Sequence, residues 1–302
     1  MGSCIVCGVD DSSGAVRAAS VAARLARDLG SRAQLVHVAD ATRGFPLSLR
    51  APRIGRGRTL RKRLRAIAEE CSFPDTTHVR VEWGDPAQGL LSAADKEDAE
   101  LLVASSGGTD YASAALVGGV ASALMRSSPC PVVVVPPRAV PPLDAEGLRC
   151  VVCGVEGNDD DVRVVRLAAD LASRLRGDLH AVLGYGKNAA AEPAPEPLAP
   201  EVDAELRDSA EESLRLVLAQ AGAQARTHVF PLAPTDALEY VVEHERAGLT
   251  VVGPSGRDVV GFGIESTAIR FAADGSTPLV VVPEKAEIEL GSGHYELAAG
   301  RS

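Results

Sequence analysis

Segment 103–136 reads VASSGGTDYASAALVGGVASALMRSSPCPVVVVP, and segment 251–283 reads VVGPSGRDVVGFGIESTAIRFAADGSTPLVVVP in the same frame. Each contains an apolar run, a loop of small residues, a helix-forming stretch and a second valine-rich run that ends in proline. When Ser105 is aligned with Gly253, Gly119 also aligns with Thr267. The repeat predicts two copies of one domain, each with a candidate ligand site at the small-residue loop.

The valine-rich runs are apolar throughout rather than alternating, which is typical of parallel strands buried on both faces. Such strands need a helical crossover between them, and that crossover is right-handed almost without exception. Small residues at the passage from strand to helix let a ligand approach the backbone closely, and the N–H groups that open a helix favour an anion. We therefore expect a phosphate-bearing ligand there.

Composition sets the class of protein. The chain has 302 residues, of which 46% are hydrophobic and 24% charged, so each half can form a core of its own. A net charge of −10 argues against general binding to nucleic acids or anionic membranes. The opening MGSCIVCGVDD does not resemble a signal peptide, and no run approaches a membrane span. We expect a cytoplasmic location, and six cysteines in this context do not predict a disulfide framework.

Strands and helices alternate along both halves, which predicts an α/β fold of two tandem, doubly wound, parallel five-stranded sheets. The predicted domains are 1–137 and 149–284, with a proline-rich linker at 138–148 and a tail at 285–302. Helices are expected near 15–29, 60–70, 117–126, 162–174, 202–219 and 236–245. Residues 41–59 are expected to be irregular. In such sheets ligands bind beyond the carboxyl ends of the strands at the topological switch point.

Several motifs together resemble the universal stress protein family. In the first half these are CIVCGVDDS, LVHV at 35–38, GDPAQGLL at 84–91 and SSPCPVVVV at 127–135; in the second half CVVCGVEG, GLTVVGPSG and STPLVVV repeat the frame more loosely. The whole chain is similar to the tandem members common in actinobacteria. The resemblance implies the fold shared with adenine nucleotide alpha hydrolases, and ATP or AMP, with or without Mg²⁺, as ligand.

The resemblance also implies site residues. ATP-binding members have an aspartate after the first strand and, after the fourth, two glycines, then a glycine and a hydroxyl residue at a helix start. The first half matches at Asp10, Gly108 and Gly118 but has Ser105 and Gly119 at the other two places. Val38, at the end of LVHV on its second strand, is a further candidate for nucleotide binding. The second half matches at Gly253, Gly256 and Thr267 but has Glu156 and Ser266 instead of aspartate and glycine.

These departures predict weakened or one-sided nucleotide binding, or none. Gly119 keeps a backbone N–H but lacks a hydroxyl, a loss of about 1 kcal/mol for one hydrogen bond. Ser105 and Ser266 matter only where glycine is needed for a positive φ or a close approach. Glu156 keeps the charge of aspartate but is one methylene longer.

Other signals have a simpler structural interpretation. The pairs Cys4/Cys7 and Cys150/Cys153 are spaced as in zinc sites, but residues three apart on a strand point to opposite faces, so we expect core packing. Segment 106–110, SGGTD, resembles a pyrophosphatase signature but follows the fourth strand rather than the first.

The charged and histidine-bearing segments also have a simpler structural interpretation beside a functional one. The arginine-rich run at 50–65 could close over a triphosphate or dock an acidic partner, although a charge run is more often a solvated helix face. His78 and His228, in matching THV segments, are interpreted as one repeated strand position. No group of histidines and carboxylates has metal-ligand spacing along the sequence, and no metal site is predicted.

The leading hypothesis is a non-enzymatic, nucleotide-responsive stress protein, because no nucleophile and base are recognisable in the sequence. Its two domains are expected to pair through their fifth strands, within one chain or across a homodimer, and its output is an interaction with an unidentified protein partner. Slow ATP hydrolysis is compatible with this hypothesis. One alternative is a nucleotide-free dimeric scaffold; the other is an enzyme whose turnover depends on Asp10 or Asp110.

Overall fold

The computed structural model describes most of the chain, namely residues 3–39, 53–107, 117–139, 148–158, 160–186, 200–253 and 267–286. Residues 140–147, most of the predicted linker, and 287–302, most of the predicted tail, lie outside them. The boundaries at 137/138, 148/149 and 284/285 therefore stay predictions.

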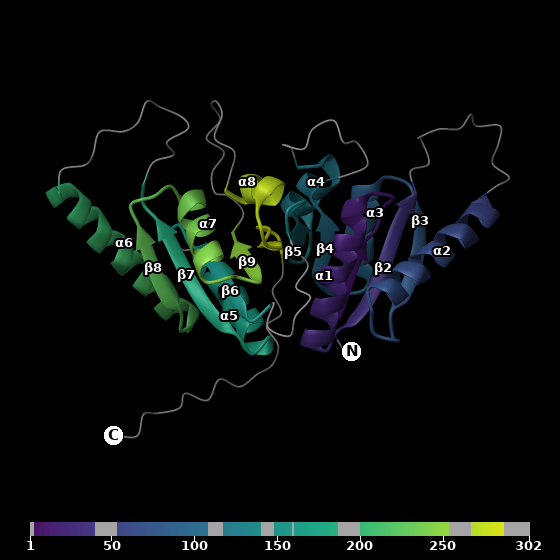
Figure 1. Cartoon of the computed structure of the whole chain (residues 1–302), viewed down its shortest axis with the longest axis horizontal. Helices are drawn as coiled ribbons and strands as arrows, with labels where there is room; N and C mark the ends of the chain where they lie inside the picture. Colours follow the sequence, from purple (N-terminus) through teal and green to yellow (C-terminus); the bar gives the residue numbers. More distant parts are fainter. Residues whose placement is uncertain are drawn as a thin grey trace, which may run out of the picture.

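The first half alternates strands and helices as predicted (Figure 1). Its strands include runs that are apolar throughout, such as VVVV of β5, and a crossover helix joins each strand to the next. The strands are therefore parallel, and they lie in the order β3-β2-β1-β4-β5. The elements are β1 (Cys4–Gly8), α1 (Ser13–Leu29), β2 (Arg32–Ala39), α2 (Arg53–Glu70), β3 (His78–Trp83), α3 (Pro86–Lys96), β4 (Ala99–Ser105), α4 (Gly119–Ser127) and β5 (Val132–Val135).

The second half repeats this order, with the strands arranged β10-β9-β6-β7-β8. The elements are β6 (Cys150–Gly154), α5 (Asp161–Arg174), β7 (Asp178–Gly184), α6 (Pro200–Ala221), β8 (Arg226–Phe230), α7 (Pro234–His244), β9 (Leu249–Val252), α8 (Thr267–Asp274) and β10 (Leu279–Val281). The predicted α/β class with two tandem sheets is confirmed.

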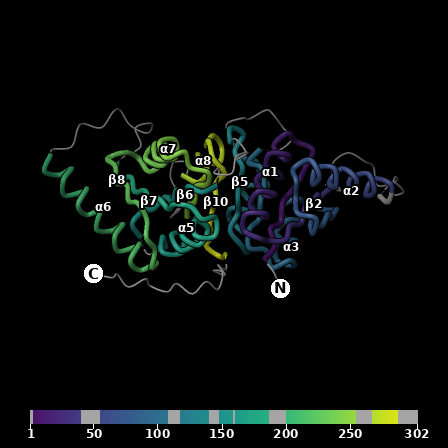
Figure 2. The backbone as a smooth tube through the Cα atoms, turned by 60° about the horizontal axis from the view of Figure 1, so that its bottom comes forward, coloured from purple at the N-terminus to yellow at the C-terminus, as the bar shows by residue number. Residues whose placement is uncertain are grey.

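The fifth strands of the two halves join these sheets into one. β5 pairs antiparallel with β10, with Val133 opposite Val280, so that ten strands form one continuous sheet. Figure 2 shows β5 and β10 side by side between the two halves. All other strand pairs are parallel. The predicted pairing through fifth strands is confirmed, and it occurs within one chain.

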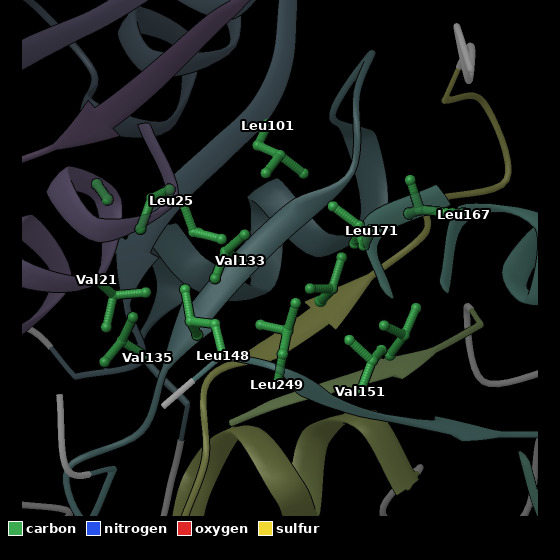
Figure 3. Close-up of a cluster of buried hydrophobic side chains, with 14 of the residues drawn as sticks. Val21, Leu25, Leu101, Val133, Val135, Leu148, Val151, Leu167, Leu171 and Leu249 are labelled. Carbon is green, nitrogen blue, oxygen red and sulfur yellow. The ribbon is translucent and has the colours of Figure 1, made fainter. Parts of the chain in front are cut away.

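Helices cover both faces of the sheet, and each face has its own core. One core contains buried side chains of α1, α2, α5 and α6; the other contains those of α3, α4, α7 and α8. The first core runs without interruption across the junction: Figure 3 shows Val21 and Leu25 of α1 in one cluster with Leu167 and Leu171 of α5, around Val133 of β5. The two halves therefore bury apolar surface against each other as well as sharing strand hydrogen bonds.

One helix boundary was predicted wrongly. α2 begins at Arg53, so residues 53–59, expected to be irregular, are helical. The sequence predicts no helix at 53–59 because Gly55 and Gly57 lower the helix propensity of this segment and most of its other residues are polar. The apolar stripe of α2 is narrow: Leu64 and Ile67 are buried on the sheet, and most other described side chains of the helix are exposed.

The cysteine pairs lie as predicted. Cys7 belongs to the core on the α1 face, whereas Cys4 belongs to the core on the opposite face. Cys153 and Cys150 divide in the same way, with Cys150 at the edge of its core. Burial raises the pKa of the Cys7 and Cys153 thiols far above the ordinary range, so these are unreactive core side chains. The two thiols of each pair cannot converge on one ion.

Candidate functional site

The site of the first half lies where β1 ends and α1 begins. Asp10 follows β1, and its Oδ1 accepts hydrogen bonds from the backbone N–H of Ser12 (2.9 Å) and from Ser12 Oγ (2.5 Å). Ser12 Oγ in turn accepts from the N–H of Ala15 (3.2 Å) and so caps the helix. Asp10 is half-buried, and both contacts hold its carboxylate at the carboxyl edge of the sheet.

The end of β4 lies against the first turn of α1. A Cβ added to Gly14 would lie 3.0 Å from the Cβ of Ser105, so this glycine permits the close approach of helix and strand. Ser105 is not among the residues with positive φ, and its Oγ donates to the carbonyl of Gly107 (2.8 Å). Serine therefore replaces the family glycine here without backbone strain.

The start of α4 is held beside this strand end. The N–H of Gly118 donates to the carbonyl of Ser106 across 2.7 Å, and α4 begins at Gly119. The structure thus brings Ser105 next to the start of α1 and ties Gly118 and Gly119 to the end of β4. A Cβ on Gly119 would meet no atom of the described residues within 4 Å, so none of these residues supplies the missing hydroxyl at that position.

Two residues of β2 complete this edge. Val38 is half-buried beneath α3: a Cβ on Gly89 would lie 2.7 Å from Val38 Cγ2. On the neighbouring position, His37 Nδ1 lies 2.8 Å from the carbonyl of Val9 and ties the ends of β1 and β2 together. Sequence reasoning did not select His37, although it stands inside the quoted LVHV motif.

Helix α2 brings positive charge to this side of the first half. Its sequence contains seven basic and two acidic residues. Arg63 forms an ion pair with Asp11, next to Asp10, and the guanidinium of Arg56 lies 6.0 Å from the ring centre of Trp83. Arg63 is thus a site neighbour within the predicted arginine-rich run, and only the fold shows which arginine approaches the strand ends.

The matching loop of the second half is closed by its own carboxylate. Asp161, only 5% exposed, accepts hydrogen bonds through Oδ2 from the backbone N–H groups of Glu156 (3.0 Å), Gly157 (2.7 Å) and Asn158 (2.9 Å). Burial raises the pKa of Asp161 despite these bonds, which lower it. Three donors that could face an anion are therefore already satisfied.

Glu156 stands in an acidic environment. Desolvation and, after it, the charge of Asp161 raise the pKa of Glu156, and Asp160 adds to the effect. The Glu156 carboxylate also accepts a hydrogen bond from the side-chain amide of Asn158 (3.3 Å). Helix α6 contains six acidic and two basic residues. Its net charge is therefore negative, whereas that of α2, its counterpart in the first half, is positive.

The remaining predicted residues of the second half are only partly described. Thr267 begins α8, and its Oγ1 accepts a 3.4 Å hydrogen bond from Thr235 Oγ1 at the start of α7. Gly253 follows β9, where a Cβ would lie 3.2 Å from Val164. Gly108, Gly256 and Ser266 lie outside the described residues, as does Asp110, so the phosphate-loop part of the prediction stays untested.

The strand register corrects the interpretation of His78 and His228 as one repeated position. His78 lies opposite Gln34 of β2. The residue of β7 that matches Gln34 is His180, whereas His228 lies opposite Val182, two residues further along β7. By register, the counterpart of His228 in the first half is Arg80. The shared THV letters are a coincidence of sequence, which only strand pairing reveals.

Comparison with known proteins identifies the family. The model of the universal stress protein family matches residues 3–136 and again 148–283. The chain therefore belongs to the universal stress protein family, as a tandem of two domains.

Solved structures share the tandem architecture. A universal stress protein from Archaeoglobus fulgidus matches with a TM-score of 0.66 and 14% identity, over 93% of this chain and 98% of that one. A putative universal stress protein from Pseudomonas aeruginosa matches with a TM-score of 0.56 and 18% identity, over 94% of each chain. At these identities the likeness concerns the fold alone. No curated protein matches the chain significantly, and none of the described helices is long and apolar enough to cross a bilayer.

Proposed function

We propose that this universal stress protein binds an adenine nucleotide, ATP or AMP, in its first half and serves as a non-enzymatic sensor. The observation that carries the proposal is the difference between the two strand-end loops. In the first half a basic helix approaches Asp10 through the contact of Arg63 with Asp11. In the second half the buried Asp161 carboxylate occupies the loop N–H groups.

Electrostatics favours the first half for an anionic ligand. Two unit charges 4 Å apart interact by about 1 kcal/mol even in bulk water, and more strongly near a protein surface. A polyphosphate near α2 faces a surplus of basic side chains, whereas one near α6 faces a surplus of acidic side chains besides Glu156 and Asp160. Repulsion of the phosphates by these acidic side chains, together with loop N–H groups already bonded to Asp161, disfavours nucleotide binding in the second half.

In this proposal the parts of the first half have separate tasks. Asp10 binds the sugar or base side of the nucleotide. The N–H groups at the start of α4, beginning with Gly119, bind phosphate oxygens, because a helix start favours anions. Val38 packs against the ligand from β2. The output is an interaction with a protein partner that depends on the ligand, with no transfer chemistry, and the Mg²⁺ ion accompanies the phosphates rather than a protein cage.

The test is acid release and chromatographic identification of the nucleotide that copurifies with the full chain. Asp10→Ala and Glu156→Ala form a matched pair, since both positions follow the first strand of their half; Thr267→Ala is a second control. We expect Asp10→Ala to lose the nucleotide and both second-half variants to retain it. Loss in Glu156→Ala or Thr267→Ala, with retention in Asp10→Ala, contradicts the assignment to the first half. Absence of nucleotide throughout, with no calorimetric binding of added ATP, supports the scaffold alternative.

A further inference from the structure

Three side chains of the second half converge at the outer part of its sheet. His180 on β7 and His228 on β8 face each other, with 3.0 Å between Nδ1 of the first and Nε2 of the second. Glu245, directly after α7, places Oε2 at 4.0 Å from Nε2 of His180. One nitrogen of each imidazole and a carboxylate oxygen all lie within 4.8 Å of one another.

The structure assigns a transition-metal site to His180, His228 and Glu245, with Zn²⁺ as the fitting ion. Two imidazoles and one carboxylate form a ligand set that zinc takes in proteins, with an open fourth position for water. On tetrahedral zinc, with bonds of about 2.0–2.1 Å, two ligand atoms lie about 3.3 Å apart. Nδ1 of His180 and Nε2 of His228 are within a few tenths of an ångström of this spacing. The Glu245 oxygen lies 4.0 Å from the other ring nitrogen of His180, Nε2, and the three ligand atoms lie within 4.8 Å of one another, so the carboxylate has up to about 1.5 Å to close.

The imidazoles are held in place before any ion arrives. His180 is 2% exposed, and its ring lies within 9° of parallel to that of His228. The ring of Phe230 is 6.3 Å from that of His228 between centres and 12° from parallel to it. Glu245, with 36% of its side chain exposed, is the adjustable ligand and keeps the site open to solvent. Packed imidazoles beside a partly exposed carboxylate suit the capture of an ion from solution.

The nearby charges fit a cation. Arg226 is the nearby opposing charge, and Asp178 lies 3.9 Å from its guanidinium, which offsets it. Magnesium and calcium prefer oxygen ligands and are poorly served by two imidazoles.

The equivalent positions of the first half carry other side chains. By strand register Gln34 stands where His180 does, and Arg80 stands where His228 does; Glu97 follows α3 as Glu245 follows α7. There Gln34 Nε2 donates to Glu97 Oε1 at 3.1 Å. The carboxylate is thus common to both halves, and the two imidazoles are confined to the second.

The test uses the full chain after removal of metals with a chelator, titrated with Zn²⁺ in a calorimeter and with Co²⁺ followed by visible absorption. We expect one Zn²⁺ per chain, and at least about tenfold weaker binding in His180→Gln and in His228→Gln, since even an outer partner of a metal ligand contributes this much. His244→Gln is the matched control, because His244 is exposed on α7, where its ring stacks on that of Tyr240 and its Nδ1 lies 2.9 Å from the Tyr240 carbonyl. It should bind Zn²⁺ as the unaltered chain does.

Folding of each variant is checked by circular dichroism. His180→Gln introduces the residue that the first half tolerates, and His228→Gln changes a half-buried strand residue, so at least one of them should remain folded and decide the question. Zn²⁺ binding unchanged in the folded variants, or no Zn²⁺ binding by the unaltered chain, overturns the assignment. Zn²⁺ should also raise the melting temperature of the unaltered chain, as a ligand of the native state does, and not that of the variants.

Discussion

Arg174 is the side chain whose removal should most weaken the union of the two halves. It lies in the last turn of α5, and its guanidinium contacts Glu100 of the first half at 2.8 Å and Asp170 of its own helix at 3.4 Å. It also donates to the carbonyl of Leu29 at 3.4 Å. Ser31 Oγ donates to the same Glu100 carboxylate. In Arg174→Met the apolar stem remains, and two carboxylates lose their counter-charge.

The expected loss follows from burial. The side chains of Arg174, Glu100 and Asp170 are 25%, 15% and 9% exposed. Removing one partner of a fully buried ion pair costs about 3–5 kcal/mol, and an exposed pair contributes about 0–1 kcal/mol. For this intermediate burial we expect a loss of about 2–3 kcal/mol in the free energy of unfolding.

Arg138→Met is the matched control. Arg138 also joins the halves, through Asp274 at 3.1 Å, but the two side chains are 67% and 72% exposed. We expect this variant to lose less than about 1 kcal/mol. The assay is urea denaturation followed by the fluorescence of Trp83, the single tryptophan, and by circular dichroism of the whole chain. A loss in Arg174→Met no larger than in Arg138→Met refutes the reasoning.

The same variant has a predictable pH dependence. Burial raises the pKa of Asp170 even beside Arg174, which lowers it. An acid whose pKa is higher in the folded than in the unfolded state costs stability when ionised, and that cost disappears as the pH falls through the folded-state pKa. Without the guanidinium the pKa rises further, so the stability difference between Arg174→Met and the unaltered chain should shrink on acidification from pH 7 toward pH 5. A difference that grows instead contradicts this account.

Two further variants probe the strand-end loops. Gly119→Ser restores the hydroxyl that the family pattern has at the start of α4, where an added Cβ meets no atom of the described residues within 4 Å. It should tighten ATP binding measured by calorimetry by about 1 kcal/mol, or about fivefold. Unchanged affinity argues that the phosphates lie elsewhere. Asp161→Ala leaves three backbone N–H groups without their acceptor, so it should lower the free energy of unfolding by about 2–3 kcal/mol. Asp161→Asn keeps an acceptor oxygen and should lower it by less. Equal losses in urea denaturation contradict the capping role of Asp161.

The fold was predictable because its signals are local and repeated. Four successive valines at 132–135 identify a strand buried on both faces, and the same frame at 279–281 identifies its counterpart. Whether β5 and β10 meet within one chain or between two chains depends on the linker and the shape of both sheets, which no local pattern contains. The helical start at Arg53 was missed because Gly55 and Gly57 outweighed a narrow apolar stripe in the sequence reasoning.

The candidate sites were predictable only in part. Asp10 and Gly118 stand in recognisable frames, whereas the capping carboxylate of Asp161 sits in an acidic run, GNDDD, where several residues could have served. The cluster of His180, His228 and Glu245 draws one residue from each of two strands and one from a helix end. Spacing along the chain does not reveal it, since the register of β7 with β8 sets the distance between the imidazoles.

The antiparallel pairing of β5 with β10 joins two homologous domains within one chain. Because the domains are covalently linked, their sequences need not be identical. In an assembly of two identical copies, a substitution that builds or removes a site acts on both copies at once. Here each half can change alone while the tether keeps its partner at hand. Single substitutions can therefore give the two halves different ligands, such as the nucleotide proposed near Arg63 and the metal ion proposed near His228.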